Sequence, residues 1–394
     1  MGSRPLRVAV FSDSALPILN GVSISIDALV REMRNQGHSV HVFTASHFRY
    51  KDPDPNTSRF LALTTPWARN YPLAVPPFYP MLHRFRKQPF DVIHTHTPFT
   101  IGFVGLRWAQ SHGIPVVSTY HTLYDKYAHY IPLFPKRYVR YKIAKHTNFY
   151  YNQVDHVITP SEASMKWLRR HSVHRPITVI PTGVSRLLSV DRSETRQRFG
   201  IAPNHKVLLY VGRIAKEKNM SVLFEAAALV FASDPHARLW LVGDGPYREQ
   251  CSQMARELGI GDRVKFVGFI PREEVDAYYA ASDLFVFSSL TETQGLVVNE
   301  AMSYGLPAVV VNGGGAGASV VDDVNGLLVR NDSEQMAESI LTILNDEQLA
   351  AKLSDGALRT GREYSVASMA ERAVDVYRSV IQDGSVTGSR AALI

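Results

Sequence analysis

The sequence has almost no cysteine: Cys251 is the single one in 394 residues. One cysteine cannot form an internal disulfide, which fits a reducing compartment, and nothing beside it indicates a nucleophile. The chain also has no run of about 18 apolar residues, the length that a membrane-spanning helix needs. Its first residues lack the apolar core of a signal peptide. We therefore expect a cytoplasmic protein without membrane spans, which could still lie on a membrane surface.

Acidic residues are scarce in the first half of the chain. Residues 1–185 carry 22 lysine and arginine residues against 9 aspartate and glutamate residues, a net charge of +13. Residues 186–394 carry 21 against 27, a net charge of −6. A basic chain could bind nucleic acid. A division this sharp indicates instead that the first half faces some other anionic partner, and we expect no nucleic acid.

Apolar strands alternate with amphipathic stretches along both halves, a pattern typical of βα units around a parallel sheet. The first half has expected strands at 7–11, 40–44, 60–64, 92–94, 116–119, 156–159 and 177–180, a helix at about 23–35 and a Pro-rich loop over 71–80. The second half has expected strands at 207–211, 239–242, 264–267, 284–287 and 308–311, and helices at 333–344 and 347–364.

The length of the chain also bears on its domain organisation. At 394 residues it is too long for one ordinary core. We expect an α/β protein with domains at 1–185 and 186–365, joined by a polar linker. A helix at 366–382 follows, and the small, polar residues of 383–394 are expected to form a flexible tail.

One stretch, 291–302, directly follows the apolar run 284–287, which is short enough to be a buried strand. Thr293 is a suitable N-cap, so a helix is expected to begin near Gln294. The unpaired N–H groups at such a helix start favour an anion just beyond the strand end.

Two glutamates flank this helix start. Glu292 precedes the helix, and Glu300 lies about a turn and a half inside it. Both could simply be solvated charges that favour the helix dipole. With a phosphate between them, however, their carboxylates would suit hydroxyl groups on either side. A sugar nucleotide has this layout, because its diphosphate lies between the hydroxyl groups of a sugar and those of a ribose.

The Glu-x7-Glu spacing of Glu292 and Glu300 after a buried strand resembles the donor-site signature of retaining glycosyltransferases of family four. The resemblance covers almost the whole chain. It implies the GT-B fold, in which two Rossmann-like domains face each other across a cleft and a C-terminal helix crosses back to the first domain. It also implies a nucleoside diphosphate sugar as co-substrate, with no metal and no other cofactor.

In the second half, Arg213 and Lys218 leave the strand at 207–211 and resemble the family's phosphate-binding pair. They could also form an ordinary exposed basic loop. By the resemblance, His121 of the first half lies against the donor sugar and joins Arg213, Lys218 and Glu292 as the catalytic set, although a histidine at a strand end is often structural. The expected donor-binding residues are Gly21, Gly243, Gly245, Val267, Gly268, Thr293, Gln294, Gly295, Leu296 and Glu300.

Further residues of the first half are expected on the acceptor side. Asn20 precedes the glycine loop after the first strand, and His94 and His96 lie at a strand end. Two histidines could bind zinc, but no third ligand stands at a convincing spacing. Asp52 and Asp54 imitate the Asp-x-Asp metal motif within a Pro-rich turn. We therefore expect no metal.

The stretch 120–132, which includes Tyr120 and Tyr124 as expected acceptor-side residues, resembles bacterial diacylglycerol glucosyltransferases of the family. Basic and aromatic residues alternate just after it, and Lys166, Trp167, Arg169 and Arg170 repeat the pattern. Such surfaces suit an anionic membrane. We expect transfer of a hexose, glucose from UDP-glucose, to a lipid hydroxyl such as that of diacylglycerol. The enzyme would lie peripherally on the inner face of the cell membrane.

Three alternatives stay open. The acceptor could be a soluble sugar or sugar phosphate, or the chain could bind a sugar nucleotide without catalysis. The glycine run 313–318, with Asp332 beyond it, also resembles a dinucleotide fingerprint. That reading predicts a nicotinamide-dependent oxidoreductase, but the fingerprint normally opens a βαβ domain and here it follows four strands.

Overall fold

The computed structural model describes residues 4–18, 20–47, 50–63, 73–75, 78–121, 135–184, 190–292, 294–313 and 315–386. It divides into two compact units. The N-terminal unit comprises Met1–Gly183 with Val366–Ile394, and the C-terminal unit comprises Val184–Ser365. No helix in the described part of the chain is long and apolar enough to cross a membrane.

A parallel sheet of seven strands forms the centre of the N-terminal unit, in the order β3-β2-β1-β6-β7-β8-β9. Its strands are β1 (Arg7–Ser12), β2 (Ser39–Ala45), β3 (Thr57–Phe60), β6 (Val92–Thr95), β7 (Val116–Thr119), β8 (His156–Thr159) and β9 (Ile177–Val179). A small antiparallel pair, β4 (Ala62–Leu63) and β5 (Leu73–Ala74), lies beside it.

The expected strand at 60–64 is not one continuous strand: β3 ends at Phe60, β4 covers Ala62–Leu63, and residue 64 lies outside the described residues. The pairing of β3 with β2 ends at Phe60, whose carbonyl accepts a hydrogen bond from the Ser46 N–H (2.8 Å). The next residues pair with β5 instead. The Pro-rich segment 71–80 is not wholly a loop either, because it contains β5 and the start of α2 (Tyr79–Arg86). Pro80 stands in the first turn of this helix, where a missing N–H costs nothing.

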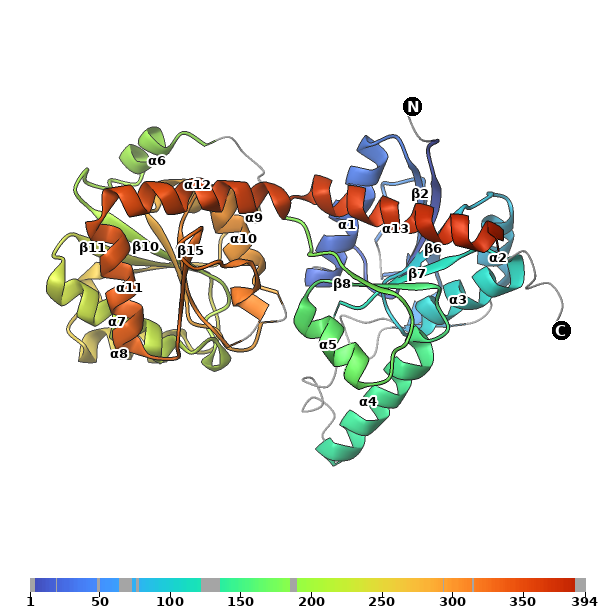
Figure 1. Ribbon diagram of the computed structural model, residues 1–394, viewed down its shortest axis with the longest axis horizontal. Helices are drawn as coiled ribbons and strands as arrows, with labels where there is room; N and C mark the ends of the chain where they lie inside the picture. Colours follow the sequence, from blue (N-terminus) through green and yellow to red (C-terminus); the bar gives the residue numbers. More distant parts are fainter. Residues whose placement is uncertain are drawn as a thin grey trace. The chain divides into compact units, whose positions relative to one another are not determined.

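Helices cover both faces of this sheet. They are α1 (Gly21–Asn35), α2, α3 (Thr100–His112), α4 (Lys136–Tyr151), α5 (Glu162–Arg170) and α13 (Val366–Val386). Side chains alternate along β1, so Val8 and Val10 pack with α1 and α13 while Ala9 and Phe11 pack on the opposite face with α3. Figure 1 shows α13 alongside α1.

The C-terminal helix α13 therefore packs on the first domain, which confirms the crossing-back helix of the fold prediction. Its buried residues recur every three or four positions, as in Met369, Ala373, Val376 and Val380. The helix continues to Val386, so residues 383–386 are helical and do not belong to a flexible tail. Residues 387–394 lie outside the described residues.

The C-terminal unit contains a parallel sheet of six strands in the order β12-β11-β10-β13-β14-β15. These are β10 (Lys206–Val211), β11 (Ala237–Val242), β12 (Val264–Gly268), β13 (Leu284–Phe287), β14 (Ala308–Val311) and β15 (Gly326–Val329). Its helices are α6 (Arg192–Arg198), α7 (Met220–Ser233), α8 (Arg248–Glu257), α9 (Arg272–Ala281), α10 (Leu296–Ser303), α11 (Ser333–Asn345) and α12 (Glu347–Glu363). The short 3₁₀ turns are η2 (Lys216–Lys218), η3 (Gly261–Arg263) and η4 (Gly315–Ser319).

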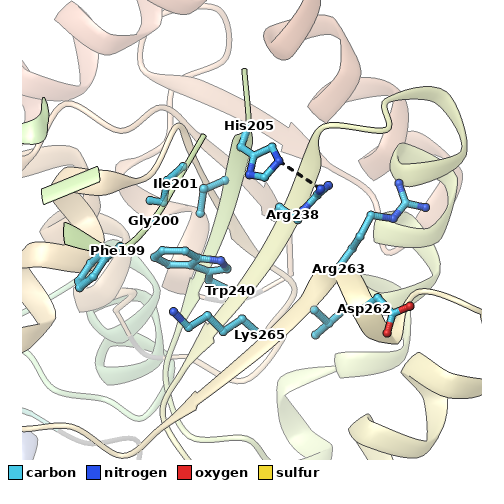
Figure 2. Close-up of a pocket in the computed structure, with 11 residues that line it drawn as sticks. Phe199, Gly200, Ile201, His205, Arg238, Trp240, Asp262, Arg263 and Lys265 are labelled. Carbon is cyan, nitrogen blue, oxygen red and sulfur yellow. Dashed lines mark hydrogen bonds between the residues drawn. The ribbon is translucent and has the colours of Figure 1, made fainter. Parts of the chain in front are cut away.

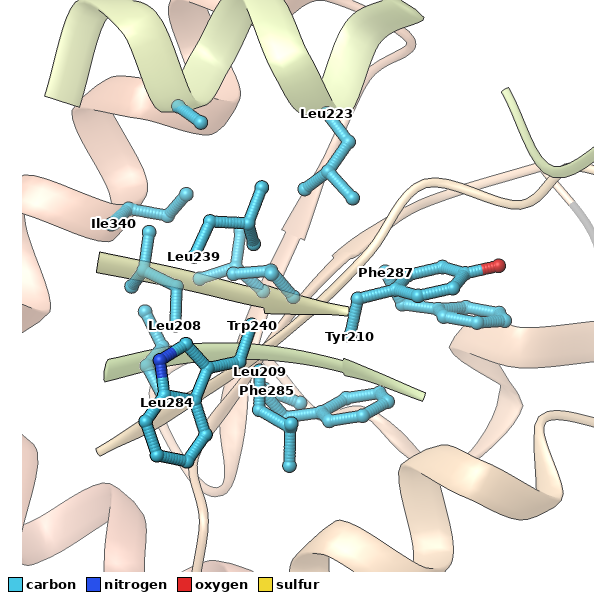
Figure 3. Close-up of a cluster of buried hydrophobic side chains, with 14 of the residues drawn as sticks. Leu208, Leu209, Tyr210, Leu223, Leu239, Trp240, Leu284, Phe285, Phe287 and Ile340 are labelled. Atoms are coloured by element: carbon cyan, nitrogen blue, oxygen red, sulfur yellow. The ribbon is translucent and has the colours of Figure 1, made fainter. Parts of the chain in front are cut away.

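Apolar side chains fill both faces of this second sheet. Figure 3 shows Leu239 of β11 near Leu223 of α7 and Ile340 of α11, whereas the next residue, Trp240, points to the opposite face with Phe285. Both sheets are wholly parallel along their main strands, which confirms the prediction of two Rossmann-like units.

The strand order reverses once in each sheet, between β1 and β6 and between β10 and β13. At such a reversal the connections leave toward opposite sides and open a crevice at the carboxyl ends of the strands, where α/β proteins bind ligands. The predicted site residues can therefore be located relative to these two points.

Candidate functional site

An ion pair lies at the reversal point of the C-terminal unit. Lys218 belongs to η2, which follows β10, and Glu292 belongs to the loop that follows β13. Lys218 Nζ donates a hydrogen bond to Glu292 Oε1, which also accepts one from Ser289 Oγ (3.3 Å). The side chains are 18% and 22% exposed, so the pair is accessible from the carboxyl ends of the strands. The predicted phosphate ligand and the predicted sugar ligand thus contact each other.

This contact leaves binding capacity on both side chains. An ammonium group has three N–H donors and a carboxylate has two oxygens. Lys218 and Ser289 both contact the Glu292 carboxylate at Oε1. Glu292 Oε2 and the other protons of the Lys218 ammonium are therefore placed to bind further oxygen-rich groups.

Arg213 lies in the turn directly after β10. Its carbonyl oxygen accepts a hydrogen bond from the buried Tyr210 hydroxyl (3.1 Å), which fixes the backbone of the turn. The Arg213 side chain is exposed, and no described residue forms an ion pair with its guanidinium. A ligand anion could therefore bind Arg213 without displacing a protein partner.

Two glycines hold the neighbouring turn against that of Arg213. A Cβ on Gly243 would stand 2.0 Å from the carbonyl oxygen of Gly212, and one on Gly245 would stand 2.1 Å from that of Ile214. Gly243 also has a φ of +129°, a conformation that favours glycine. Its N–H donates to the carbonyl of Gly268 (2.9 Å), which joins the ends of β11 and β12. Gly243, Gly245 and Gly268 therefore shape the backbone at this edge, and Val267 lies half-buried beside them.

The helix after Glu292 begins later than expected. Thr293 lies outside the described residues, and α10 begins at Leu296 with Gly295 as its N-cap and no capping side chain. The Gly295 N–H donates to the Gly315 carbonyl (3.3 Å), and the Leu296 N–H donates to the Gln294 carbonyl (2.9 Å). These two amides are therefore engaged within the loop, contrary to their expected role as free donors to a ligand. The loop tightens in this way because Gly295 packs directly against Ala316.

Glu300 lies in α10 with its side chain 19% exposed, and it has two partners. Its Oε2 accepts a hydrogen bond from the Tyr279 hydroxyl (2.8 Å), and its Oε1 lies 3.3 Å from Arg272 Nη2. Burial raises the pKa of the Glu300 carboxyl, while the Arg272 guanidinium and the Tyr279 hydroxyl act in the opposite direction. Glu292 and Glu300 are thus held by different partners: Lys218 and Ser289 contact Glu292, whereas Arg272 and Tyr279 contact Glu300.

In the N-terminal unit, the predicted histidines form one cluster. His96 Nδ1 lies 2.9 Å from His121 Nε2, and the ring centres of His94 and His96 are 3.9 Å apart. Burial lowers the pKa of His94 to about 3 and that of His121 to about 4, so both rings are neutral at neutral pH. The structure therefore brings together three histidines that the sequence places at the ends of two strands.

The cluster extends to the C-terminal helix. His94 Nδ1 lies 2.6 Å from the hydroxyl of Tyr377 on α13, and its Nε2 lies 2.7 Å from Thr119 Oγ1. Sequence reasoning did not connect Tyr377 with His94, because the two residues stand 283 positions apart. Only its place in the buried stripe of α13 predicted that it would face the sheet.

The other predicted residues of the first half have structural roles in the described part. Asn20 caps α1 through a reciprocal capping box with Ser23. A Cβ on Gly21 would meet no described atom within 4 Å, so this glycine relieves no crowding there. Tyr120 is fully buried and stacks on Trp167, with ring centres 5.6 Å apart, so it does not line an acceptor site as expected. Tyr124 lies outside the described residues.

Comparison with known proteins agrees with this geometry. Residues 19–186 match the family model Glycosyltransferase Family 4, and residues 191–360 match Glycosyl transferases group 1. The alpha-monoglucosyldiacylglycerol synthase of Streptococcus pneumoniae is 32% identical over 372 residues, which cover 88% of this chain and 82% of that protein. The synthase of the same name from Acholeplasma laidlawii is 29% identical over 389 residues, covering 95% and 98%.

The chain belongs to the family-four glycosyltransferases.

Other relatives of this glycosyltransferase carry different names. The D-inositol 3-phosphate glycosyltransferase of Thermobispora bispora is 30% identical over 307 residues, covering 74% of this chain and 71% of that one. Sucrose-phosphate synthase of Thermosynechococcus elongatus has the same fold, with a TM-score of 0.73 at 24% identity over 96% of this chain and all of that one. Anabaena HepE, solved in complex with UDP, matches with a TM-score of 0.73 at 22% identity over 95% and 100%.

Membership of this family overturns the oxidoreductase alternative built on the glycine run 313–318. In the structure, this part of the glycosyltransferase forms η4 and supports the loop of Glu292. The Gly315 N–H donates to the Glu292 carbonyl (2.7 Å), and the Gly315 carbonyl accepts from Gly295. A Cβ on Gly313 would stand 2.3 Å from Leu290 Cδ2. The small residues therefore allow two loops to pack closely at the strand ends, and Gly314 lies outside the described residues.

Sequence reasoning missed Asp13, which follows β1 at the reversal point of the N-terminal unit. Its carboxylate accepts hydrogen bonds from Thr97 Oγ1 (2.6 Å) and the Ile101 N–H (3.0 Å), and so occupies the N-terminus of α3. Burial raises its pKa. The available signal was an acidic residue directly after the first strand of a parallel sheet.

The two aspartates of the segment that resembles an Asp-x-Asp metal motif form ion pairs with nearby arginines. Asp52 pairs with Arg59 Nη2 (2.5 Å) and Asp54 with Arg34 Nη1 (2.9 Å). Across the described ranges, no group of three or more histidine, cysteine, aspartate or glutamate side chains is arranged to hold a metal ion.

Figure 2 shows residues that line a surface pocket of about 230 Å³ in the C-terminal unit. None of the predicted donor residues lines it. It is lined by Phe199, Gly200, Ile201, His205, Val207, Arg238, Trp240, Asp262, Arg263, Val264 and Lys265. Val207 and Val264 stand near the amino ends of β10 and β12, whereas the ion pair stands beyond the carboxyl ends of β10 and β13. Lys265 Nζ lies 4.4 Å from the centre of a Trp240 ring, so its charge already has an aromatic partner.

Proposed function

We propose that this glycosyltransferase transfers a hexose, glucose from UDP-glucose, to the hydroxyl of diacylglycerol at an anionic membrane surface, with retention of the anomeric configuration. The observation that carries the donor half of the proposal is the pairing of Lys218 with Glu292 at the reversal point between β10 and β13. It sets a cation suited to a diphosphate beside an anion suited to sugar hydroxyls.

The diphosphate binds to Lys218 and Arg213. Each cation forms charge-assisted hydrogen bonds with phosphate oxygens, and these bonds strengthen as negative charge grows on the leaving group. Positive side chains take over the role that a metal ion has in other glycosyltransferases, so the reaction proceeds without one. Activity that survives dialysis against a chelator would support this step, and activity restored only by a divalent cation would refute it.

The sugar and ribose contact the two glutamates. Glu292 Oε2 accepts a hydrogen bond from a hexose hydroxyl, and Glu300 from the ribose. No protein nucleophile is needed if an oxygen of the departing phosphate takes the proton from the acceptor hydroxyl on the face that it leaves. The prefix alpha in the name of the S. pneumoniae and A. laidlawii relatives supports retention for an α-linked donor.

The lipid half of the proposal rests on α4. Tyr138, Tyr141 and Phe149 of this helix are 47%, 60% and 58% exposed, and Lys142 and Lys145 are exposed beside them. Their spacing places aromatic and basic side chains along one side of a helix. Aromatic rings favour the interface of a bilayer, and each basic residue near an anionic surface contributes about 1 kcal/mol.

The neighbouring helix α5 does not repeat this pattern as the sequence suggested. The Trp167 ring packs between Tyr120 and His171, with ring centres 5.6 and 3.9 Å away. Arg169 Nη1 donates to the Val173 carbonyl (2.8 Å). The amphipathic contact is therefore assigned to α4 alone.

One assay tests the whole proposal. The protein is supplied with a panel of nucleotide sugars and with diacylglycerol in vesicles that contain an anionic phospholipid, and nucleotide release, product mass and anomeric configuration are measured. UDP-glucose and diacylglycerol are expected to give an α-glucosyl lipid. Transfer only to soluble acceptors such as inositol phosphate would refute the lipid half, and donor binding without nucleotide release would refute catalysis.

Sedimentation with vesicles tests the membrane surface. Replacing Tyr141 and Phe149 with serine, or Lys142 and Lys145 with glutamate, is expected to reduce binding to anionic vesicles by about tenfold or more. The matched control is Leu229→Ser, which removes an apolar side chain that is 43% exposed on α7 of the other unit. Equal loss in the control, or binding that ignores the charge of the lipid, would contradict the assignment.

A further inference from the structure

The contact between His96 and His121 has a direction that the structure allows us to assign. The two nitrogens, His96 Nδ1 and His121 Nε2, are 2.9 Å apart, which is hydrogen-bond distance. A hydrogen bond between two neutral imidazoles needs one donor and one acceptor. Either ring could in principle supply the proton.

The two arrangements differ at the other nitrogen of His96. His96 Nε2 is buried and has no hydrogen-bond partner among the residues that the structure describes. If His121 donated the bond, His96 would carry its own proton on Nε2, as a buried N–H without an acceptor. Orphaned N–H groups of that kind are rarer in proteins than buried acceptors that lack a donor. The arrangement in which His96 Nδ1–H donates to His121 Nε2 avoids this orphan.

The orientation of the His96 ring is itself fixed by its neighbour. The His94 ring packs against it at a tilt, with ring centres 3.9 Å apart and a 40° angle between the planes. His94 is held at both nitrogens, by Thr119 Oγ1 and by the Tyr377 hydroxyl. Because His94 cannot rotate without losing two hydrogen bonds, it restricts the plane of the His96 ring, and the contact of Nδ1 with His121 Nε2 sets which edge of the ring faces His121.

We propose that His96 is a positioning residue that holds His121 in the tautomer with its proton on Nδ1. Together with the proposed function, on which this inference rests, it defines the chemistry of His121. Nε2 is occupied as an acceptor and Nδ1 is protonated, so His121 is a neutral hydrogen-bond donor through Nδ1. It does not act as a general base.

The tautomer can be read without any activity measurement. The full-length protein is labelled with ¹⁵N-histidine, and multiple-bond proton–nitrogen spectra are recorded at neutral pH. His121 signals are assigned by their loss in His121→Gln. We expect a protonated Nδ1 and an unprotonated Nε2 for His121. The opposite pattern in the unmodified protein would overturn the proposal, whatever the activity.

Two variants of His96 separate positioning from packing. In His96→Asn the side-chain amide can donate from near the position of Nδ1, whereas His96→Leu fills the space without a donor. We expect His96→Asn to keep the tautomer of His121 and most of kcat. His96→Leu is expected to lower kcat by about 10²-fold with little change in KM for the donor. Equal losses of kcat in the two variants would contradict the proposal.

The outcomes also separate this inference from the proposed function. If His96→Leu does not fold, the spectrum of the unmodified protein and the asparagine variant still decide the tautomer. If the tautomer is as expected but His121→Ala transfers sugar at the normal rate, the catalytic role that the family resemblance implies for His121 is refuted while the hydrogen bond from His96 stands.

Discussion

Lys218 and Glu292 contact each other although they are 74 positions apart in the sequence. The parallel sheet produces this contact, because β10 and β13 are neighbours and both chains leave at the same edge. Each residue therefore neutralises the charge of the other in the absence of a ligand. A ligand can bind both residues if it has anionic oxygens and hydroxyl groups. A sugar diphosphate has phosphate oxygens for the ammonium and hydroxyl groups for the carboxylate.

The first prediction concerns this pair. Lys218→Ala and Glu292→Ala are each expected to lower kcat by about 10²–10³-fold, because each removes a group that acts on the donor. Stability should fall by only about 1 kcal/mol or less, since both side chains are partly exposed. Transfer assays and thermal unfolding check the two expectations. Turnover close to normal in either variant would contradict the site, and Glu292→Gln tests whether the charge itself is needed.

A second prediction compares two cations of the same loop. Arg213 and Lys216 are both exposed, but only Arg213 is assigned to the diphosphate. Arg213→Ala is expected to lower kcat/KM by about 10²-fold, whereas Lys216→Ala leaves it nearly unchanged. Neither variant should change the melting temperature appreciably, because no described residue forms an ion pair with either side chain. Similar losses in both variants would mean that the loop contributes only a general positive potential.

The sequence predicted where the strands of the donor site end, but it did not predict which side chains contact each other at those ends. The strands β10 and β13, and the residues that follow them, were identifiable because short apolar runs end at Gly212 and Ser288. The strand β15 was missed, since it is short and follows the polar turn of Asp322 and Asp323. Periodicity shows where strands end, but it does not show which side chains meet there.

Aromatic residues show the same limit in the first half. The family resemblance predicts Tyr120 on the acceptor side, and the basic neighbours of Trp167 predict a membrane-facing residue, yet the two rings stack on each other. The helix α2 was likewise hidden by the prolines around it. For Tyr120 and Trp167, a tertiary contact decided the structure against the local sequence pattern. For α2, a proline in the first helical turn is compatible with a helix although prolines usually indicate a loop.

A third prediction tests the glycines that shape the donor edge. Gly243→Ala places a Cβ within 2.0 Å of the Gly212 carbonyl oxygen, at a φ of +129°. We expect a loss of about 3 kcal/mol or more in the free energy of unfolding, because backbone atoms must move. Gly261→Ala is the control: a Cβ there meets no described atom within 4 Å, and the expected change is about 1 kcal/mol at most. Equal losses of free energy of unfolding in the two variants would show that the contact between the turns of Gly243 and Gly212 does not determine the cost of the substitution.

A fourth prediction distinguishes the two glutamates. Glu300→Ala leaves the buried Tyr279 hydroxyl without its acceptor and removes one partner of Arg272, so stability is expected to fall by about 1–3 kcal/mol. Donor affinity should fall as well if Glu300 binds the ribose. Glu300→Gln keeps an oxygen for Tyr279 and is expected to lose less stability than Glu300→Ala. Calorimetric titration with UDP separates the loss of binding from the loss of stability.

The last prediction concerns acid. His41 lies outside the proposed site, and burial lowers its pKa to about 4 from the ordinary value of 6.5, with Asp54 opposing and Arg34 and Arg84 reinforcing the shift. Unfolding restores its ordinary affinity for protons, so the unfolded chain binds the proton more tightly between about pH 6.5 and pH 4. The contribution of neutral His41 to stability is therefore complete above that window and is lost as the pH falls through it. His41→Gln, which does not titrate and can still donate to Ser58, is expected to unfold with a shallower dependence on pH. Urea unfolding at several pH values across this window measures the slope, and an unchanged slope would show that His41 is not buried in its neutral form.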